Sequence, residues 1–310
     1  MRVGFIGLGV MGEPMCRNLV AGRGSTIEQV VVHDVRPEPV AGLVEVGAVD
    51  GGSVAAVVER VDVVLLSLPG GPELESVVAG PDGVLSVLAA DQLVVDHTTA
   101  PVALTRRLAG RCRERRAGWC DAPIARTRQA AIDGTLSIMV GGDPDDVERV
   151  RPVLATMAGD VTRCGGVGSG QVTKLLNNMM LFQNVRAVAE AHAIATGLDR
   201  LHGDDLGLDV ETVFEVIAGA SGGSFALANH GRKAILPGDY PLRAFSTTYA
   251  AKDLAYALEL AAETGVDAVG AETVGELLAA TADAGLADRY FPVLRRLLGS
   301  AAGEEPGGRT

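Results

Sequence analysis

Near its start the chain reads Val3-Gly4-Phe5-Ile6-Gly7-Leu8-Gly9-Val10-Met11-Gly12, an apolar run followed by glycines in the spacing G-x-G-x-x-G. A helical pattern follows to about residue 20. Between a strand and a helix, this spacing is typical of a dinucleotide-binding turn, because glycines allow a tight turn and a close approach to a pyrophosphate. The open amides at the helix start suit the same anion. We therefore expect the whole turn to bind a cofactor: Gly7, Leu8, Gly9, Val10, Met11 and Gly12.

An acidic residue follows at the spacing that such turns use for the adenosine ribose. The second apolar run ends at Asp34, which lies 22 residues after Gly12. A carboxylate at this place favours NAD, because it repels the 2′-phosphate of NADP. Arg36 lies two residues further on and could offset that repulsion. NAD is therefore the expected cofactor, with NADP as the alternative.

The first half of the chain alternates short Val/Ile/Leu runs with helical stretches. The runs cover residues 3–6, 30–33, 61–68, 93–96 and 136–141. This alternation predicts an α/β fold with a doubly wound parallel sheet, a Rossmann domain. The runs are continuous rather than alternating, as in strands that are buried on both faces.

Strand patterns stop at the glycine-rich segment 164–170, and helical patterns continue from there. One long helix is expected from this segment to about Thr196, and shorter helices at 210–218, 254–263 and 271–284. We therefore expect a Rossmann domain over 1–165, an all-α domain over 166–300 that is joined to it by the long helix, and a disordered tail over 301–310.

Composition excludes several classes of function. A net charge of −12 argues against nucleic acid as a partner, and the arginines between 106 and 116 are expected on a solvated helix face. No apolar run reaches the roughly 18 residues that a membrane span needs. The four cysteines have no C-x-x-C spacing and no leader precedes the first strand, which indicates a reducing cytoplasm. The five histidines show no ligand spacing, so no metal is expected.

A lysine and an asparagine near the start of the long helix suit carbonyl chemistry. Lys174 and Asn178 are spaced i, i+4 and therefore share a face. An ammonium can protonate a carbonyl oxygen and the neutral amine can accept the proton back, while an amide holds the same oxygen. The alternative is a lysine that only solvates the helix start, where the helix dipole disfavours its charge.

Four separated motifs resemble the β-hydroxyacid dehydrogenase family, which includes the 3-hydroxyisobutyrate dehydrogenases. They are Gly4 to Met15, Asp121-Ala122-Pro123, Gly168 to Asn178, and Phe245 to Leu254. The resemblance covers nearly the whole chain in order. It implies a Rossmann domain, a helical second domain, homodimers or homotetramers, and NAD(P)-dependent oxidation of short 3-hydroxy acids or reduction of the matching aldehydes.

The resemblance also assigns roles to individual residues. It implies that Lys174 is catalytic, that Asn178 orients the substrate, and that Phe245 closes the pocket. Further substrate contacts are implied at Thr98 and Gly170. Cofactor contacts are implied at Leu68, Pro69, Glu73, Thr99 and Lys252. Structural alternatives remain: Leu68-Pro69 as a strand end, Phe245 as a core aromatic, and Lys252 as a surface ion pair with Asp253.

One loop departs from the family. Relatives commonly read S-G-G where this chain reads Ala125-Arg126-Thr127. A guanidinium there can bind an oxyanion, so we expect Arg126 and Thr127 to contact an anionic substrate. The loop is similar to the G-R-T of the sulfolactaldehyde reductase branch, but Ala125 replaces its glycine, which leaves the sulfonate open. The alternative is that Arg126 points to solvent.

Together these features predict an NAD(P)-dependent oxidoreductase that acts on a small anionic hydroxy acid or its aldehyde. An imine or other carbonyl reductase of the same superfamily is one alternative, and a nucleotide-binding module without turnover is another. Neither nucleic acid nor a membrane is expected as a partner.

Overall fold

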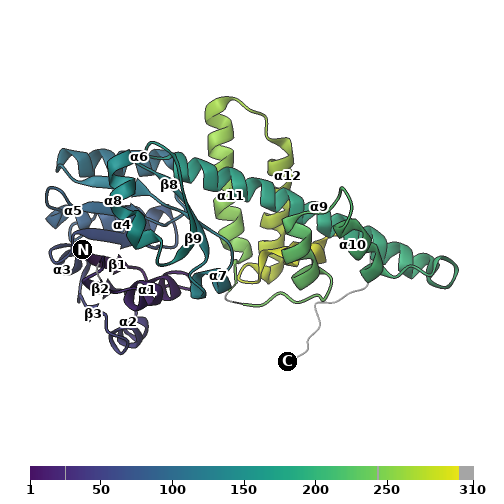
Figure 1. Ribbon diagram of the computed structural model, residues 1–310. Coiled ribbons are helices and arrows are strands. Elements are labelled where there is room, and N and C mark those ends of the chain that lie inside the picture. Colours follow the sequence, from purple (N-terminus) through teal and green to yellow (C-terminus); the bar gives the residue numbers. More distant parts are fainter. Residues whose placement is uncertain (25, 243, 300–310) are drawn as a thin grey trace. The chain divides into compact units, whose positions relative to one another are not determined.

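The computed structural model describes residues 1–24, 26–242 and 244–299, and it gives no side-chain detail for 203 and 204. The tail expected at 301–310 lies outside the described residues. The chain divides into two units, Met1–Leu175 and Leu176–Thr310, and the division falls inside the long helix α9 (Ser169–Leu206) (Figure 1).

A nine-stranded sheet forms the centre of the first unit. Its strand order is β3-β2-β1-β4-β5-β6-β8-β7, and β9 pairs with β8. The strands are β1 (Arg2–Ile6), β2 (Gln29–His33), β3 (Val49–Asp50), β4 (Val63–Leu66), β5 (Leu93–Asp96), β6 (Gly118–Asp121), β7 (Ile124–Ala125), β8 (Leu136–Gly141) and β9 (Ala158–Gly165). Strands β1 to β6 pair in parallel, and the order reverses between β1 and β4, as in a Rossmann fold. The expected fold class is confirmed.

The sheet departs from the prediction at its far side. The run at 136–141 was expected in the parallel sheet, but β8 pairs antiparallel with β6 and β7 and parallel only with β9. The connection from β6 holds only β7 and the one-turn helix α7 (Arg128–Ile132), so it is no crossover helix and turns the chain back. Strands β3, β6, β7 and β9 escaped recognition because they are very short or carry few Val, Ile and Leu residues.

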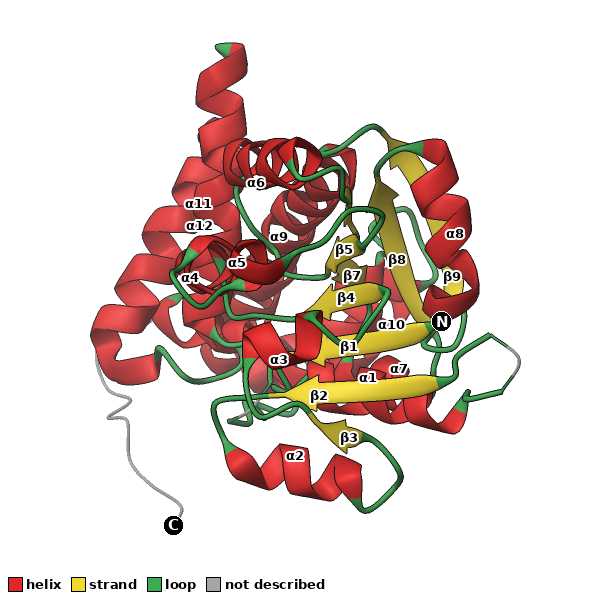
Figure 2. Ribbon diagram, turned by 90° about the vertical axis from the view of Figure 1, so that its left-hand side faces the viewer, coloured by secondary structure: helices red, strands yellow, loops and turns green. Residues whose placement is uncertain are grey.

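Helices cover both faces of the sheet, so alternate side chains of one strand enter different cores (Figure 2). Phe5 packs with residues of α1, α2, α7 and α8, whereas its neighbour Ile6 packs with α3, α4, α5 and α6. Burying one such side chain contributes about 1.5–3 kcal/mol. The helices are α1 (Gly12–Ala21), α2 (Pro37–Val44), α3 (Val54–Val58), α4 (Gly71–Ala79), α5 (Val84–Val87), α6 (Val102–Glu114) and α8 (Pro144–Leu154). The arginines between 106 and 116 are all exposed, as expected.

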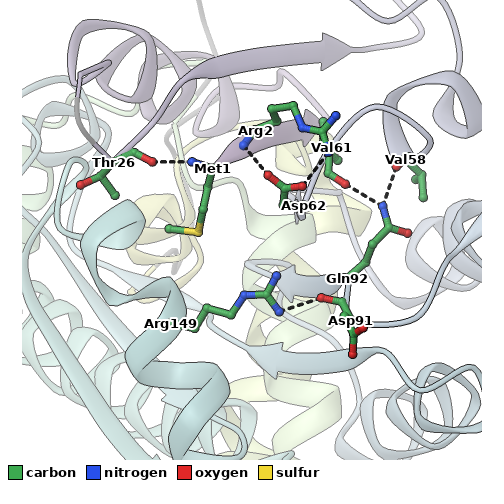
Figure 3. A network of polar contacts seen from close by, with 9 residues as sticks. All are labelled: Met1, Arg2, Thr26, Val58, Val61, Asp62, Asp91, Gln92 and Arg149. Atoms are coloured by element: carbon green, nitrogen blue, oxygen red, sulfur yellow. Dashed lines mark hydrogen bonds and ion pairs between the residues drawn. The ribbon is translucent and has the colours of Figure 1, made fainter.

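Polar contacts tie the strands together at their amino ends (Figure 3). Arg2 donates from its guanidinium to Asp62 at 2.7 Å, which joins the start of β1 to the start of β4. The Gln92 amide donates to the carbonyls of Val58 and Val61, both at 2.7 Å. The glycine turn follows β1 at the opposite, carboxyl edge of the sheet. These hydrogen bonds therefore do not occupy the edge where the turn lies.

The elements of the second unit are all helices within its described residues, and loops and one isolated β-bridge, Ser246 to Tyr290, lie between them. Beyond α9 it contains α10 (Val210–Ala218), a π-helical segment η1 (Leu227–Ile235), α11 (Thr247–Thr264), α12 (Val269–Thr281), η2 (Ala282–Leu286) and η3 (Phe291–Leu297). Helices α11 and α12 pack against each other (Figure 1). Their apolar faces share a core with Phe182 of α9 and Phe291. Among the described residues, none of the helices combines the length and the hydropathy that crossing a bilayer requires.

Three helix limits differ from the expected ones. Helix α9 continues past Thr196 to Leu206, with a non-helical residue at His202. Helix α11 begins at Thr247 rather than 254, because the Ser246 hydroxyl accepts from the Tyr249 amide at 3.3 Å and caps it. Helix α12 ends at Thr281 rather than 284, where η2 takes over. The segment 245–254 therefore lies largely on a helix.

Candidate active site

Different structural features explain the three glycines of the turn. Gly7 has a φ of +95°, and a Cβ there would lie 2.3 Å from the Ser67 carbonyl oxygen. A Cβ on Gly12 would lie 2.1 Å from the carbonyl oxygen of Gly7. A Cβ on Gly9 would meet nothing within 4 Å. The turn itself thus explains Gly7 and Gly12, whereas Gly9 faces open space that a dinucleotide can approach.

Asp34 holds the turn from the end of β2. One carboxylate oxygen accepts from the Leu8 amide at 2.6 Å, and the other accepts from the Arg36 amide at 2.9 Å and from its guanidinium at 3.1 Å. Burial opposes ionisation, but these hydrogen bonds outweigh it and leave the pKa of Asp34 below its ordinary value. An ionised carboxylate can accept about four hydrogen bonds, so these three leave capacity for a ribose hydroxyl.

Arg36 is committed to the same turn. Besides its contacts with Asp34, its guanidinium donates to the Leu8 carbonyl at 2.9 Å. Its charge therefore neutralises Asp34 within the protein, while its side chain stays half-exposed. This geometry fits the adenosine end of a dinucleotide.

The carboxyl ends of β4 and β5 are joined through Thr98. The Thr98 hydroxyl accepts from the backbone N–H of Leu68 at 3.1 Å. The side-chain amide of Gln171 donates to the backbone carbonyl of Thr98 at 2.6 Å. Thr98 is buried, Thr99 and Leu68 are half-buried, and Pro69 and Glu73 are exposed. The structure thus uses the Thr98 hydroxyl to hold the loop of Leu68, which adds a structural task to the substrate contact expected of it.

A buried carboxylate fixes the start of α9. Asp121 accepts from the amides of Gly168 at 2.7 Å and Gln171 at 2.9 Å. Burial raises the pKa of Asp121, and these backbone hydrogen bonds counteract the rise. Gly170 must be glycine for packing, since a Cβ there would lie 2.5 Å from the Met139 carbonyl oxygen. Sequence reasoning gave Asp121 no role, although it stands in the Asp121-Ala122-Pro123 motif.

Lys174 lies one turn further along α9 and is half-buried. Its helix face is set by the fixed first turn, since Asp121 holds the amides just before it. Asn178 follows after four residues, a rise of about 6 Å along a helix.

The loop of Arg126 is strained. Arg126 has a φ of +85°, a left-handed conformation that side chains rarely adopt. Its exposed guanidinium donates to the Thr135 carbonyl at 2.7 Å, which uses one of five N–H groups. Thr127 is exposed and begins α7 through its backbone alone. Strain of this kind, of about 1–3 kcal/mol, clusters at functional sites.

In the second unit, Asn178 and Lys252 meet the same carboxylate. The Asn178 amide nitrogen donates to Asp253 Oδ2 at 2.8 Å, and Lys252 Nζ lies 3.1 Å from Asp253 Oδ1. The side chain of Asp253 is only 3% exposed and that of Lys252 is 23% exposed. The ion pair weighed for Lys252 therefore forms, but within a buried cluster rather than on the surface.

Two sets of aromatic rings lie on this part of the chain, and Tyr249 joins them, since its ring stacks on that of Phe245 at 6.5 Å. Phe245 stacks on Phe182 with ring centroids 5.9 Å apart and meets Phe291 edge-on at 5.7 Å. The Lys252 ammonium lies 5.7 Å from the ring centre of Tyr249 and 5.4 Å from that of Tyr256, within cation–π range. Phe245 is half-buried, so it contributes to the core and also keeps an accessible edge.

No group of three or more potential metal ligands occurs among the described residues. His192 packs on Phe214 and accepts a hydrogen bond from Arg295 at 2.8 Å. His97 is buried and donates to the Ala122 carbonyl at 2.7 Å.

Comparison with known proteins agrees with this geometry. Residues 2–166 match the model of the NAD binding domain of 6-phosphogluconate dehydrogenase. Residues 168–297 match that of the NAD-binding domain of NADP-dependent 3-hydroxyisobutyrate dehydrogenase. The chain is thus an NAD(P)-dependent dehydrogenase or reductase. It belongs to the β-hydroxyacid dehydrogenase family.

Several relatives are similar over most of the chain. The 2-(hydroxymethyl)glutarate dehydrogenase of Eubacterium barkeri is 34% identical over 86% of this chain and 84% of its own length. The 3-sulfolactaldehyde reductase of Escherichia coli is 32% identical over 84% and 83%. The solved 3-hydroxyisobutyrate dehydrogenase of Mycobacterium tuberculosis superposes with a TM-score of 0.83 at 31% identity and covers 96% of this chain and 98% of that one.

Proposed function

We propose that this protein interconverts a short anionic 3-hydroxy acid and its aldehyde, with NAD preferred over NADP. The observation that carries the proposal is the placement of Lys174 and Asn178 one turn apart on α9, directly after the helix start that Asp121 fixes. Substrates named for the relatives, among them 3-hydroxyisobutyrate and 3-sulfolactaldehyde, belong to this class.

Residues of the first unit hold the cofactor in this proposal. The open side of Gly9 receives the pyrophosphate, and Asp34 accepts from the ribose. The rest of the cofactor is lined by Leu68, Pro69, Glu73 and Thr99. The bound cofactor supplies hydride transfer. The hydrogen bonds of Arg36 support NAD, because its guanidinium already donates to the Asp34 carboxylate and the Leu8 carbonyl and has fewer N–H groups left for a 2′-phosphate.

In this proposal Lys174 transfers the proton to and from the substrate oxygen. Its ammonium donates to the carbonyl oxygen when the aldehyde is reduced, and its amine accepts from the hydroxyl in the reverse direction. Asn178 orients the same oxygen, and Lys252 contributes a positive charge beside the cofactor. Phe245 covers the substrate with an aromatic surface.

Arg126 binds the anionic end of the substrate in this proposal. Thr127, Thr98 and Gly170 make further contacts with the substrate. Four N–H groups of Arg126 remain after its bond to Thr135, enough for a bidentate contact with carboxylate or sulfonate. The strained backbone of Arg126 supports a functional reason for keeping arginine there.

We further propose that the protein forms homodimers or homotetramers in the cytoplasm. Ile194, Leu198 and Leu201 of α9 are 64%, 39% and 76% exposed, and their spacing puts them on one face. Such an apolar stripe suits a second copy of the chain. Four free thiols, three of them buried, suit a reducing compartment. Sedimentation that shows only monomers would contradict the assembly.

The test follows NADH oxidation with sulfolactaldehyde, succinic semialdehyde, glyoxylate and 2-hydroxy-3-oxopropionate. Wild-type protein is compared with Arg126→Ala and with the control Arg128→Ala, an exposed neighbour on α7. We expect turnover of at least one aldehyde, with KM raised about tenfold or more only in Arg126→Ala, the size of one charge-assisted hydrogen bond. Silence across the panel despite NADH binding would reject the substrate class.

A further inference from the structure

Asp253 stands behind two residues of the proposed site. It is buried on α11, and its two carboxylate oxygens face different partners. Oδ2 accepts from the Asn178 amide at 2.8 Å, and Oδ1 lies 3.1 Å from Lys252 Nζ. Asn178 stands 75 residues earlier in the chain and is itself 2% exposed. One carboxylate thus joins a buried amide of α9 to an ammonium of α11.

The chemistry of a carboxylate fixes the orientation of the Asn178 amide. An ionised carboxylate only accepts hydrogen bonds, so the group of Asn178 that faces Asp253 must be the NH₂ group. The other end of the side chain is consistent with this orientation, because Asn178 Oδ1 accepts from the side-chain amide of Asn177 at 3.1 Å. With these two contacts the amide has one orientation, and its second N–H is a donor for another partner.

The same carboxylate holds the ammonium of Lys252 in place. Neighbouring residues on a helix do not face each other, yet Lys252 reaches back to Asp253. Tyr249 and Tyr256 lie three residues before and four residues after Lys252, on its own face, and their rings flank the ammonium. The ammonium of Lys252 thus lies between two rings and a carboxylate.

We propose that Asp253 is a positioning residue: it fixes Asn178 as a hydrogen-bond donor toward the substrate oxygen and holds the Lys252 ammonium beside the cofactor. Asp253 itself touches neither substrate nor cofactor. This inference rests on the proposed function, since it gives Asn178 and Lys252 the tasks described above.

The two tasks can be separated by substitution. Asp253→Asn keeps the shape and an acceptor for Asn178 but removes the charge that holds Lys252. Asp253→Leu keeps the approximate volume and removes both contacts. Asp253→Asn should mainly raise KM for NADH, by about 10-fold, and Asp253→Leu should also lower kcat by about 10- to 100-fold, the range for hydrogen bonds to charged groups. Asp253→Glu, which retains the charge, should recover part of the NADH affinity.

The experiment combines these variants with Asn178→Ala in a double-mutant cycle. Its kinetics use the aldehyde that wild-type protein turns over fastest, and thermal unfolding shows that each variant is folded. If Asp253 acts through Asn178, kcat of Asn178→Ala/Asp253→Leu equals that of Asn178→Ala alone. Independent losses that multiply would overturn the proposal, as would unchanged KM for NADH in Asp253→Asn.

A failure of the proposed function has a different signature. If wild-type protein turns over no aldehyde, NADH fluorescence titration of the same variants still tests the hold on Lys252. A dissociation constant about 10-fold weaker in Asp253→Asn, and partly restored in Asp253→Glu, would support that half of the inference. Equal dissociation constants would reject it, and so would equal losses in both variants. If Asp253→Asn does not fold, Asp253→Glu against wild type decides the matter, with an unchanged KM and kcat as the opposing result.

Discussion

The cofactor turn of the first unit and the Asn178 cluster of the second are built by different means. The turn is backbone: glycine conformations, the Leu8 amide and carbonyl, and one carboxylate that holds them. The cluster is made of side chains: an amide, a buried carboxylate, and an ammonium between two tyrosine rings. A polyanion that must be held firmly suits fixed backbone amides, whereas proton transfer and substrate choice need side chains with chemistry of their own.

The largest effect is expected from Lys174→Ala. If side-chain chemistry resides at the start of α9, kcat should fall by about 10²–10⁴, the usual contribution of one proton-transfer group. Stopped-flow or steady-state NADH oxidation measures it. The control is Lys233→Ala, an exposed lysine whose ammonium donates to the Asn229 side chain within η1. Full turnover in Lys174→Ala would remove this residue from the mechanism.

Two glycine substitutions test the backbone side of the comparison. Gly7→Ala forces a side chain into a φ of +95° and against the Ser67 carbonyl, so it should destabilise the fold by about 2 kcal/mol or more. Gly9→Ala meets no atom within 4 Å and should leave the melting temperature unchanged while NADH affinity falls about 10-fold or more. Calorimetry and NADH fluorescence measure the pair. Loss of stability in Gly9→Ala with intact NADH binding would contradict a ligand-facing role.

Acid should distinguish the two units. Burial lowers the pKa of His97 in the first unit to about 4, and it does the same for His192 and His230 in the second, with help from Arg295 and Lys233 respectively. Between pH 6.5 and 4 the unfolded chain binds these protons and the folded chain does not, so stability falls as pH falls through this window. The second unit contains two such histidines, so its amides should lose protection from hydrogen exchange before those of the first unit as the pH falls.

The measurement is urea unfolding at pH 7 and pH 5, with hydrogen exchange to assign the loss to a unit. His230→Gln removes one titrating group and should flatten the pH dependence by up to about 1.4 kcal/mol per pH unit. His202→Gln, which replaces an exposed histidine, serves as the comparison. The same slope in both variants would contradict the link to burial.

The smallest expected effect is that of Arg126→Gly on stability. Glycine relieves the left-handed strain of about 1–2 kcal/mol but adds flexibility of about 0.5–1 kcal/mol to the unfolded chain, so the two nearly cancel. Arg128→Gly, at the first residue of α7, should instead destabilise by up to about 1 kcal/mol. Chemical denaturation compares the two variants. A marked destabilisation by Arg126→Gly would show that its bond to Thr135 is structural.

The sequence predicts the first unit better than the second for a physical reason. Gly7, Gly9, Gly12 and Asp34 act through local spacing and backbone conformation, which a pattern carries directly. The link between Asn178 and Asp253 joins residues 75 positions apart, and no periodicity encodes such a contact. Polar or very short strands such as β9 and β7 escape for a similar reason, because their pairing is decided by neighbours rather than by their own apolar pattern.

Helix α9 runs without a break from its first turn, which Asp121 fixes, to Asn178. This continuity limits where residues can be inserted into or deleted from the chain. Every residue added to or removed from an α-helix rotates all that follows by about 100° and shifts it by about 1.5 Å. A single-codon deletion between Lys174 and Asn178 would thus turn Asn178 away from the lysine's face, although both of these residues remained. We expect insertions and deletions to be tolerated in surface turns, such as residues 219–224, and to be eliminated from this one helical turn.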